Sequence, residues 1–153
     1  MRIRVACDGK IKDAHLRALE IDYRHRIAHF AEIIVEEGQS SRGKTRGYAR
    51  RSSSSGRGSD GVPGSCRVLL DRRGTQWSSH EFSEWLGKQQ LRGTRELVFE
   101  VGGPDGFSEA EVQQADRLLA LSRMTLTHDW ARVLLLEQIY RAFAILRGFP
   151  YAR

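Results

Sequence analysis

The sequence predicts a single α/β domain in which helices cover a largely parallel sheet. Short runs of β-branched and aliphatic residues alternate along the chain with longer stretches whose apolar residues recur every three or four positions, the order expected of repeated strand–helix units. A length of 153 residues fits one domain with a substantial core. The hydrophobic content is 40%, and no apolar run approaches the roughly 18 residues of a membrane-spanning helix.

The N-terminal part predicts a strand, a helix and a second strand. RIRVAC, at 2–7, alternates in polarity and contains β-branched residues, and Gly9 ends the run. Between residues 12 and 29 the apolar side chains lie three or four apart, which predicts an amphipathic helix. AEIIVEE, at 31–37, is a short apolar run bounded by Gly38 and is typical of a strand.

The composition then changes abruptly over residues 38–64, which are mostly Ser, Gly and Arg. We expect a long surface loop here, interrupting a domain that spans 1–153, because the segment has almost nothing to bury. Between Gly38 and Ser59 there is no acid, and the six basic residues there equal the formal net charge of +6: Arg42, Lys44, Arg46, Arg50, Arg51 and Arg57. Clustered positive charge suits a polyanion such as RNA, whereas a merely solubilising loop fits the charge equally well.

The second half continues the alternation of strands and helices. Strands are predicted at 66–71, 96–101 and, as a short extended run, 121–129. Helices are predicted at 78–91, opening on Ser79, at 108–121, and at 131–148, where helical spacing persists up to Gly148. Because strands and helices alternate, the strands are expected to run largely parallel.

A glycine-rich turn, VGGPDGFSE at 101–109, follows the strand at 96–101. Ser108 has the position of a helix N-cap, and Glu111 completes a capping box with it. Glycines at the end of a parallel strand let the backbone approach a ligand, although an ordinary tight turn explains the same spacing. The stretch is not G-x-G-x-x-G and lacks the Lys-Ser/Thr of a P-loop, so a dinucleotide or nucleotide-triphosphate enzyme is not indicated.

Several ordered motifs together resemble the RlmH family of SPOUT-class RNA methyltransferases. The resemblance covers nearly the whole chain except 38–64, and its motifs are MRIRVACDGKIKD (1–13), VLLD (68–71), VGGPDGFS (101–108), LSRMTLTH (121–128), ARVLLLEQIYRAFAI (131–145) and PYAR (150–153). It implies a homodimeric fold with a C-terminal trefoil knot. It also implies that the protein binds S-adenosylmethionine and methylates N3 of a pseudouridine in 23S ribosomal RNA on the assembled ribosome.

The resemblance further implies which residues form the site. Those implied to bind the cofactor, many through backbone groups, are Leu70, Gly102, Gly103, Pro104, Leu121, Ser122, Arg123, Met124, Thr125, Leu126 and Thr127. The glycines would leave room for the methionine and ribose parts. On the acceptor side the candidates are His128, Arg132, Tyr151 and Arg153. The two arginines suit phosphate or base contacts, Tyr151 could stack on a base, and His128 could act as a base or contact RNA. Each also has a structural alternative, as a cap, a packed side chain or a frayed terminus.

Two departures from the family bear on the acceptor side. The chain ends Phe149-Pro150-Tyr151-Ala152-Arg153 where relatives have His-Pro-Tyr-His-Arg, and Thr127 replaces a proline, which predicts a looser loop. A non-catalytic RNA- or ribosome-binding protein on the same scaffold therefore stays open as an alternative, as does a methyltransferase directed to another RNA position.

Cysteine and histidine usage adds little chemistry. Cys7 and Cys66 lack metal-ligand spacing, and together with an N-terminus that has no signal-peptide core they predict a reduced protein of the cytoplasm. His25 and His29 lie four apart on a predicted helix, but no third ligand presents itself, so no metal site is expected.

Overall fold

The computed structural model describes residues 1–38 and 64–151. The predicted surface loop lies almost entirely outside the described residues, as does Arg153. None of the helices in the described part is long and apolar enough to cross a membrane.

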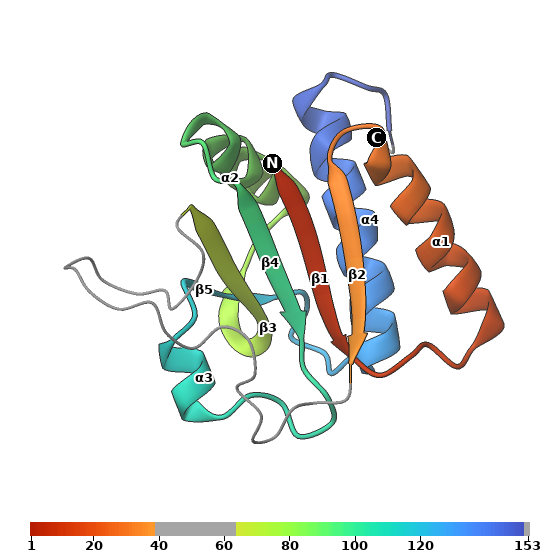
Figure 1. The fold of residues 1–153 in the computed structure, drawn as a ribbon, viewed down its shortest axis with the longest axis vertical. Coiled ribbons are helices and arrows are strands. Elements are labelled where there is room, and N and C mark those ends of the chain that lie inside the picture. The colour runs from red at the N-terminus through yellow and green to blue at the C-terminus, as the bar shows by residue number, and fades with distance from the viewer. Residues whose placement is uncertain (39–63, 152–153) are drawn as a thin grey trace.

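Five parallel strands form one sheet, which confirms the predicted fold class (Figure 1). In chain order they are β1 (Arg2–Asp8), β2 (Glu32–Gly38), β3 (Ser65–Gln76), β4 (Glu96–Val101) and β5 (Arg117–Ala120). Their order across the sheet is β2-β1-β4-β3-β5, and every pair is parallel. All carboxyl ends therefore meet at one edge of the sheet, which is the lower edge in Figure 1.

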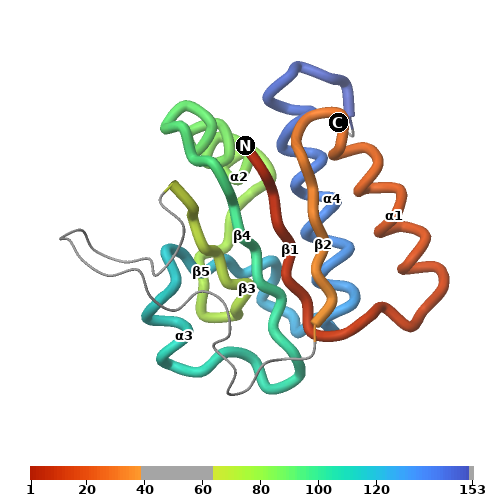
Figure 2. The backbone as a smooth tube through the Cα atoms, viewed as in Figure 1, coloured from red at the N-terminus to blue at the C-terminus, as the bar shows by residue number. Residues whose placement is uncertain are grey.

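Three long helices, α1 (Ala14–Ala28), α2 (Ser79–Leu91) and α4 (His128–Leu146), pack with the sheet, and α4 lies between the other two (Figures 1 and 2). Helix α3 (Glu109–Gln113) is short and lies near the carboxyl ends of β3 and β5. The core under α4 is built from apolar residues of these helices and of the strand faces toward them, among them Ile3, Val5, Leu86, Leu97, Phe99, Leu135, Leu136 and Ile139. Each helix begins at a side-chain cap: Asp13, Ser78, Ser108 and Thr127.

Two predictions around residue 120 were wrong. The helix predicted at 108–121 ends at Gln113, and residues 117–120 form β5. The apolar spacing of Val112, Ala115 and Leu118 fits a helix, but pairing with β3 overrides it: the Arg67 N–H donates to Asp116 Oδ2 at 2.7 Å, and the Asp116 N–H donates to the Arg67 carbonyl at 3.0 Å.

The predicted extended run at 121–129 is likewise absent. Residues 121–127 form no strand in the structure, and α4 begins at His128, three residues before its predicted start at 131. The Thr127 side chain caps this helix by accepting from the Trp130 N–H at 3.5 Å. Strand β3 is also longer than predicted, because after residue 71 the chain pairs again with β5 at Thr75 and Gln76.

The cysteines lie half-buried in strands β1 and β3. Burial raises the pKa of the Cys7 thiol to about 12 and that of Cys66 to about 11. Both thiols are therefore protonated and poorly nucleophilic at neutral pH.

Candidate functional site

Three segments far apart in sequence meet at the carboxyl ends of β3, β4 and β5. Leu70 pairs with Val101 on one side and with Leu119 on the other. The chain after Leu70, the turn 102–107 and the loop 121–127 therefore start from neighbouring positions. All the residues predicted to bind a cofactor lie in these segments, and the sheet places the starts of the segments side by side.

The turn after β4 is closed by its own backbone. The Gly106 N–H donates to the Gly103 carbonyl at 3.0 Å, and Pro104 occupies the position in which proline favours a β-turn. The Phe107 ring lies so near Gly102 that a Cβ there would be 3.1 Å from it. The predicted capping box follows at α3: the Ser108 Oγ accepts from the Glu111 N–H, and the Glu111 carboxylate accepts from the Ser108 N–H. The turn is thus held from both ends.

Gly103 lies against a side chain that sequence analysis did not single out. A Cβ built on Gly103 would lie 2.3 Å from the Asp8 Oδ2 atom at the end of β1. The family resemblance implied that the glycines of this turn leave room for a cofactor. The space beside the Gly103 Cα borders the Asp8 carboxylate. Asp8 directly follows the strand predicted at 2–7 and precedes Gly9. Its position as a carboxylate at a strand end is the sequence feature that could have identified it.

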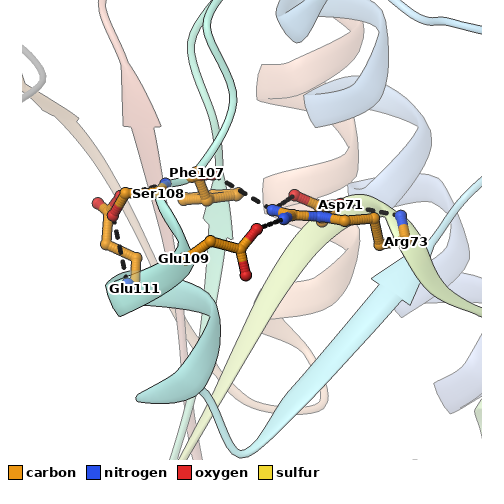
Figure 3. A network of polar contacts seen from close by, with 6 residues as sticks. All are labelled: Asp71, Arg73, Phe107, Ser108, Glu109 and Glu111. Atoms are coloured by element: carbon orange, nitrogen blue, oxygen red, sulfur yellow. Dashed lines mark hydrogen bonds and ion pairs between the residues drawn. The ribbon is translucent and has the colours of Figure 1, made fainter.

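Arg73 lies in the stretch of β3 that follows Leu70. It connects this stretch to the turn 102–107 and to α3 (Figure 3). Its guanidinium binds both carboxylate oxygens of Asp71 at 2.9 Å, donates to the Phe107 carbonyl at 3.2 Å and pairs with Glu109. The hydrogen bonds from Arg73 hold the pKa of Asp71 below its usual value. Asp71 is therefore an ionised structural partner, and Arg73 fixes the relative positions of two of the three segments.

Gly74 is the tightest backbone contact at this edge. A Cβ on Gly74 would lie 2.6 Å from both the Leu118 carbonyl carbon and the Leu119 nitrogen of β5. No side chain fits there, because the obstructing atoms are backbone atoms. The contact coincides with a register shift between Leu70 and Thr75 in the β3–β5 pairing. Gly74 was not identified from the sequence, because nothing in the residues around an isolated glycine indicates that the backbone of β5 will pack against it.

The loop 121–127 is stabilised by its own hydroxyl groups. The Ser122 Oγ accepts from the Met124 N–H at 2.9 Å, and Thr127 caps α4. The Thr127 hydroxyl supplies a cap that a proline side chain lacks, and the expectation that this residue loosens the loop stays a prediction. Met124 is 79% exposed and Trp130 54% exposed, so an apolar surface surrounds the start of α4.

The acceptor-side candidates lie in different environments. His128 is the first residue of α4 and is partly exposed, with its Nε2 3.4 Å from the Asp129 carboxylate. Arg132 is 1% exposed, and its NH2 group lies 2.6 Å from a carboxylate oxygen of both Glu20 and Glu37. The expectation that Arg132 contacts RNA phosphate is therefore not met: its guanidinium is enclosed by α1 and the end of β2 and stabilises their packing on α4.

Tyr151 is anchored rather than frayed. Its ring packs edge-on against Tyr140 with centroids 4.6 Å apart, and its hydroxyl lies 3.3 Å from that of Tyr23 and 3.4 Å from Glu137. Burial raises the pKa of the Tyr151 hydroxyl. Because Glu137 follows His128 by nine helical residues, the two candidates are about 14 Å apart along the α4 axis. One chain does not bring His128 and Tyr151 together.

No cluster of three potential metal ligands occurs among residues 1–38 and 64–151. His25 and His29 are exposed near the end of α1.

Comparison with known proteins gives a consistent family. A family profile described as "Predicted SPOUT methyltransferase" matches residues 1–152. A protein from Geobacter sp. strain M21 named "Ribosomal RNA large subunit methyltransferase H" is 40% identical over 99% of this chain and 98% of its own length. One of the same name from Pelobacter propionicus is 39% identical over 99% of both chains. Among solved structures, a probable methylase family protein from Haemophilus influenzae Rd KW20 aligns with a TM-score of 0.49 and 10% identity, over 95% of this chain and 66% of that one.

Proposed function

Since this chain belongs to the SPOUT methyltransferase family, we propose that it transfers a methyl group from S-adenosylmethionine to N3 of a pseudouridine in large-subunit ribosomal RNA. The observation that carries the proposal is the meeting of three backbone segments around Leu70, Gly102 and Leu121 at one sheet edge. Relatives that align over 99% of the chain share the name of a ribosomal RNA methyltransferase. The enzyme would work in the cytoplasm, where ribosomes are.

The residues at this edge fit the methyl donor. S-adenosylmethionine combines an apolar adenine, ribose hydroxyls and positive charge at sulfur and nitrogen. Leu70, Leu121 and Leu126 offer apolar contacts, and the carbonyl and N–H groups of turn 102–107 and loop 121–127 offer hydrogen bonds. When bound, this group would supply an activated methyl; the protein's part is to hold it in line with the acceptor nitrogen.

We further propose that the working form is a homodimer with the knotted topology of its class. His128 and Tyr151 lie about 14 Å apart along α4 within one chain, so a site that uses both requires a second copy. The exposed apolar side chains Met124, Leu126 and Trp130 surround the start of α4. Beside them, a cavity of about 270 Å³ opens between α2, β5 and α4 and is lined by Trp77, Leu121 and Leu134, among others. A second copy covering this surface would bury it.

Calorimetric titration with S-adenosylmethionine tests the cofactor half of the proposal. We expect micromolar binding near one per subunit for the wild-type chain. Gly103→Val should abolish it, because the added side chain meets Asp8 and fills the space beside the turn. Gly38→Ala is the matched control, since a Cβ at Gly38 meets nothing within 4 Å. Absence of binding by a folded wild-type protein would favour the non-catalytic RNA binder.

Methylation of purified ribosomes tests the acceptor half. Ribosomes or free large-subunit RNA lacking the modification would be incubated with enzyme and labelled donor, and the modified nucleoside identified by mass spectrometry. We expect N3-methylpseudouridine, with ribosomes preferred over free RNA. Label in another nucleoside would contradict the proposed target while keeping the methyl-transfer activity.

A further inference from the structure

The carboxyl ends of β1 and β4 mark the place where the chain connections of the sheet diverge. From β1 the chain passes through α1 outward to β2, whereas from the adjacent β4 it passes through α3 to β5 on the opposite side. In open parallel sheets, ligands bind in the crevice that forms at such a point. The residues that meet there are Asp8, which ends β1, and Gly103, which follows β4.

The Asp8 carboxylate is fixed at this crevice. A Cβ on Gly103 would lie 2.3 Å from Asp8 Oδ2 and 3.3 Å from its Cγ, so the carboxylate lies directly beside the turn. Asp8 is half-buried and pairs with Gly38 in the β1–β2 ladder. The following residue, Gly9, donates its N–H to the Gly38 carbonyl at 2.7 Å and accepts from Arg132 at 3.4 Å. Strand pairing and the buried Arg132 thus hold this end of β1 in place.

Several other carboxylates lie near this edge of the sheet. Asp71 is bound by Arg73, and Glu37 by Arg132. Asp105 lies at the exposed tip of the turn. Within the described part of the chain, other charged or titratable groups around the ends of β1, β2 and α4 include Cys7, Lys10, Arg17, Glu20, His128 and Asp129. Asp8 is the carboxylate that borders the proposed donor site through Gly103.

We propose that Asp8 accepts the N3 proton of the acceptor base. This inference rests on the proposed function. An imide N–H donates a hydrogen bond and an ionised carboxylate accepts one, so the two groups are complementary. In the step, the N3–H proton passes to the Asp8 carboxylate, the freed N3 electron pair bonds to the methyl carbon, and the carbon–sulfur bond breaks with its electrons on sulfur. Asp8 then releases the proton to water.

The test is the rate of methyl transfer by Asp8→Asn as a function of pH, with the wild-type protein measured in parallel. The asparagine preserves size and cannot take the proton, so we expect the rate at neutral pH to fall by roughly 10²- to 10⁴-fold. S-adenosylmethionine affinity, by calorimetry, and RNA affinity should stay within about threefold. The variant rate should rise more steeply into alkaline solution than the wild-type rate, because hydroxide then removes the proton that Asp8 accepts in the wild type.

Controls distinguish a proton-accepting Asp8 from one with only a structural role. They also distinguish failure of this inference from failure of the proposed function. Asp22→Asn removes an exposed carboxylate of α1, far from the proposed site in the chain, and should keep the wild-type rate, while Asp8→Glu should recover part of it. A rate for Asp8→Asn within threefold of wild type, a parallel pH profile, or a loss explained by weaker donor binding would each overturn the proposal. Failure of the wild-type protein itself to methylate the RNA would instead overturn the proposed function.

Discussion

The two halves of the sheet are built in different ways. In the β2–β1 half, seven consecutive residue pairs keep one register, and side chains pack beneath it. In the β3–β5 half the register shifts between Leu70 and Thr75, and backbone approaches backbone at Gly74. Both halves contribute buried apolar side chains to the core, but the regular half also contains the buried charges of Arg132 and Glu20, whereas the irregular half has a close backbone contact at Gly74 and the polar contacts of Arg73. The proposed site lies where the two halves meet.

The largest effect is expected from breaking the charge cluster of the regular half. Arg132→Met removes a 1% exposed guanidinium and leaves Glu20, which is 4% exposed, with only its longer 3.4 Å contact to Arg24 in place of the 2.6 Å ion pair. A buried charge left unpaired typically costs about 3–5 kcal/mol of unfolding free energy. Urea unfolding measures the loss.

The same cluster predicts a dependence on pH. Burial acts to raise the pKa of Glu37, but the hydrogen bond and charge of Arg132 outweigh it, so the pKa lies below its ordinary value of 4.5. A lowered pKa in the folded state means that this stabilisation is present at neutral pH and is lost as the pH falls through the folded pKa. In Arg132→Met, the unfolding free energy should fall less steeply than in the wild type as the pH is lowered. An unchanged slope would mean that groups other than Glu37 cause the loss of stability in acid.

A slightly smaller effect is expected at the crossing point of the irregular half. Gly74→Ala introduces a Cβ 2.6 Å from β5 backbone atoms, which cannot move aside without breaking strand pairing. We expect a loss of about 3 kcal/mol, at the upper end of the cost of overpacking. Gly38→Ala, at the end of β2, meets nothing within 4 Å and should unfold within about 0.5 kcal/mol of wild type. If Gly74→Ala and Gly38→Ala have the same unfolding curve, the close approach of Gly74 to the β5 backbone is contradicted.

The connection in Figure 3 can be weakened without unfolding the protein. Arg73→Lys keeps the charge but cannot bind Asp71, Phe107 and Glu109 together, because an ammonium lacks the planar fork. The turn 102–107 should then be less well fixed, and S-adenosylmethionine affinity should fall roughly tenfold, the loss of about one charge-assisted hydrogen bond. Arg72→Lys, at the exposed neighbouring position, is the matched control and should leave calorimetric affinity unchanged.

The smallest effect concerns the anchored C-terminus. Tyr151→Phe keeps the ring contact with Tyr140 and removes the hydroxyl that lies 3.3 Å from Tyr23 and 3.4 Å from Glu137. A loss of about 0.5–1.5 kcal/mol is expected for these hydrogen bonds. In a double-mutant cycle with Tyr23→Phe the two losses should not add, since both variants remove the same interaction. Full additivity would mean that the hydroxyls do not interact.

The sequence predicted the elements that local patterns determine. The strands at β1, β2 and β4, the helices α1, α2 and α4, and the capped turn at Ser108 follow from period, glycines and caps. Strand β5 was mistaken for helix because only its pairing with β3, some 50 residues away, determines it. The burial of Arg132 was missed for the same reason, as Glu20 and Glu37 come from distant elements.

The predicted cofactor segments do meet, but Asp8, Arg73 and Gly74 were not found. Each owes its importance to a neighbour supplied by the fold: Gly103 for Asp8, Phe107 and Glu109 for Arg73, and the β5 backbone for Gly74. No periodicity or spacing within one segment contains such information. Their identification required the register of the sheet.

The register shift in β3 also constrains the order of folding. Leu119 pairs with both Leu70 and Thr75, so β5 takes its place only when the two stretches of β3 on either side of the shift are already arranged around it. We therefore expect β3 to acquire amide protection before β5 during refolding, so that the proposed donor site is completed only once β5 has paired.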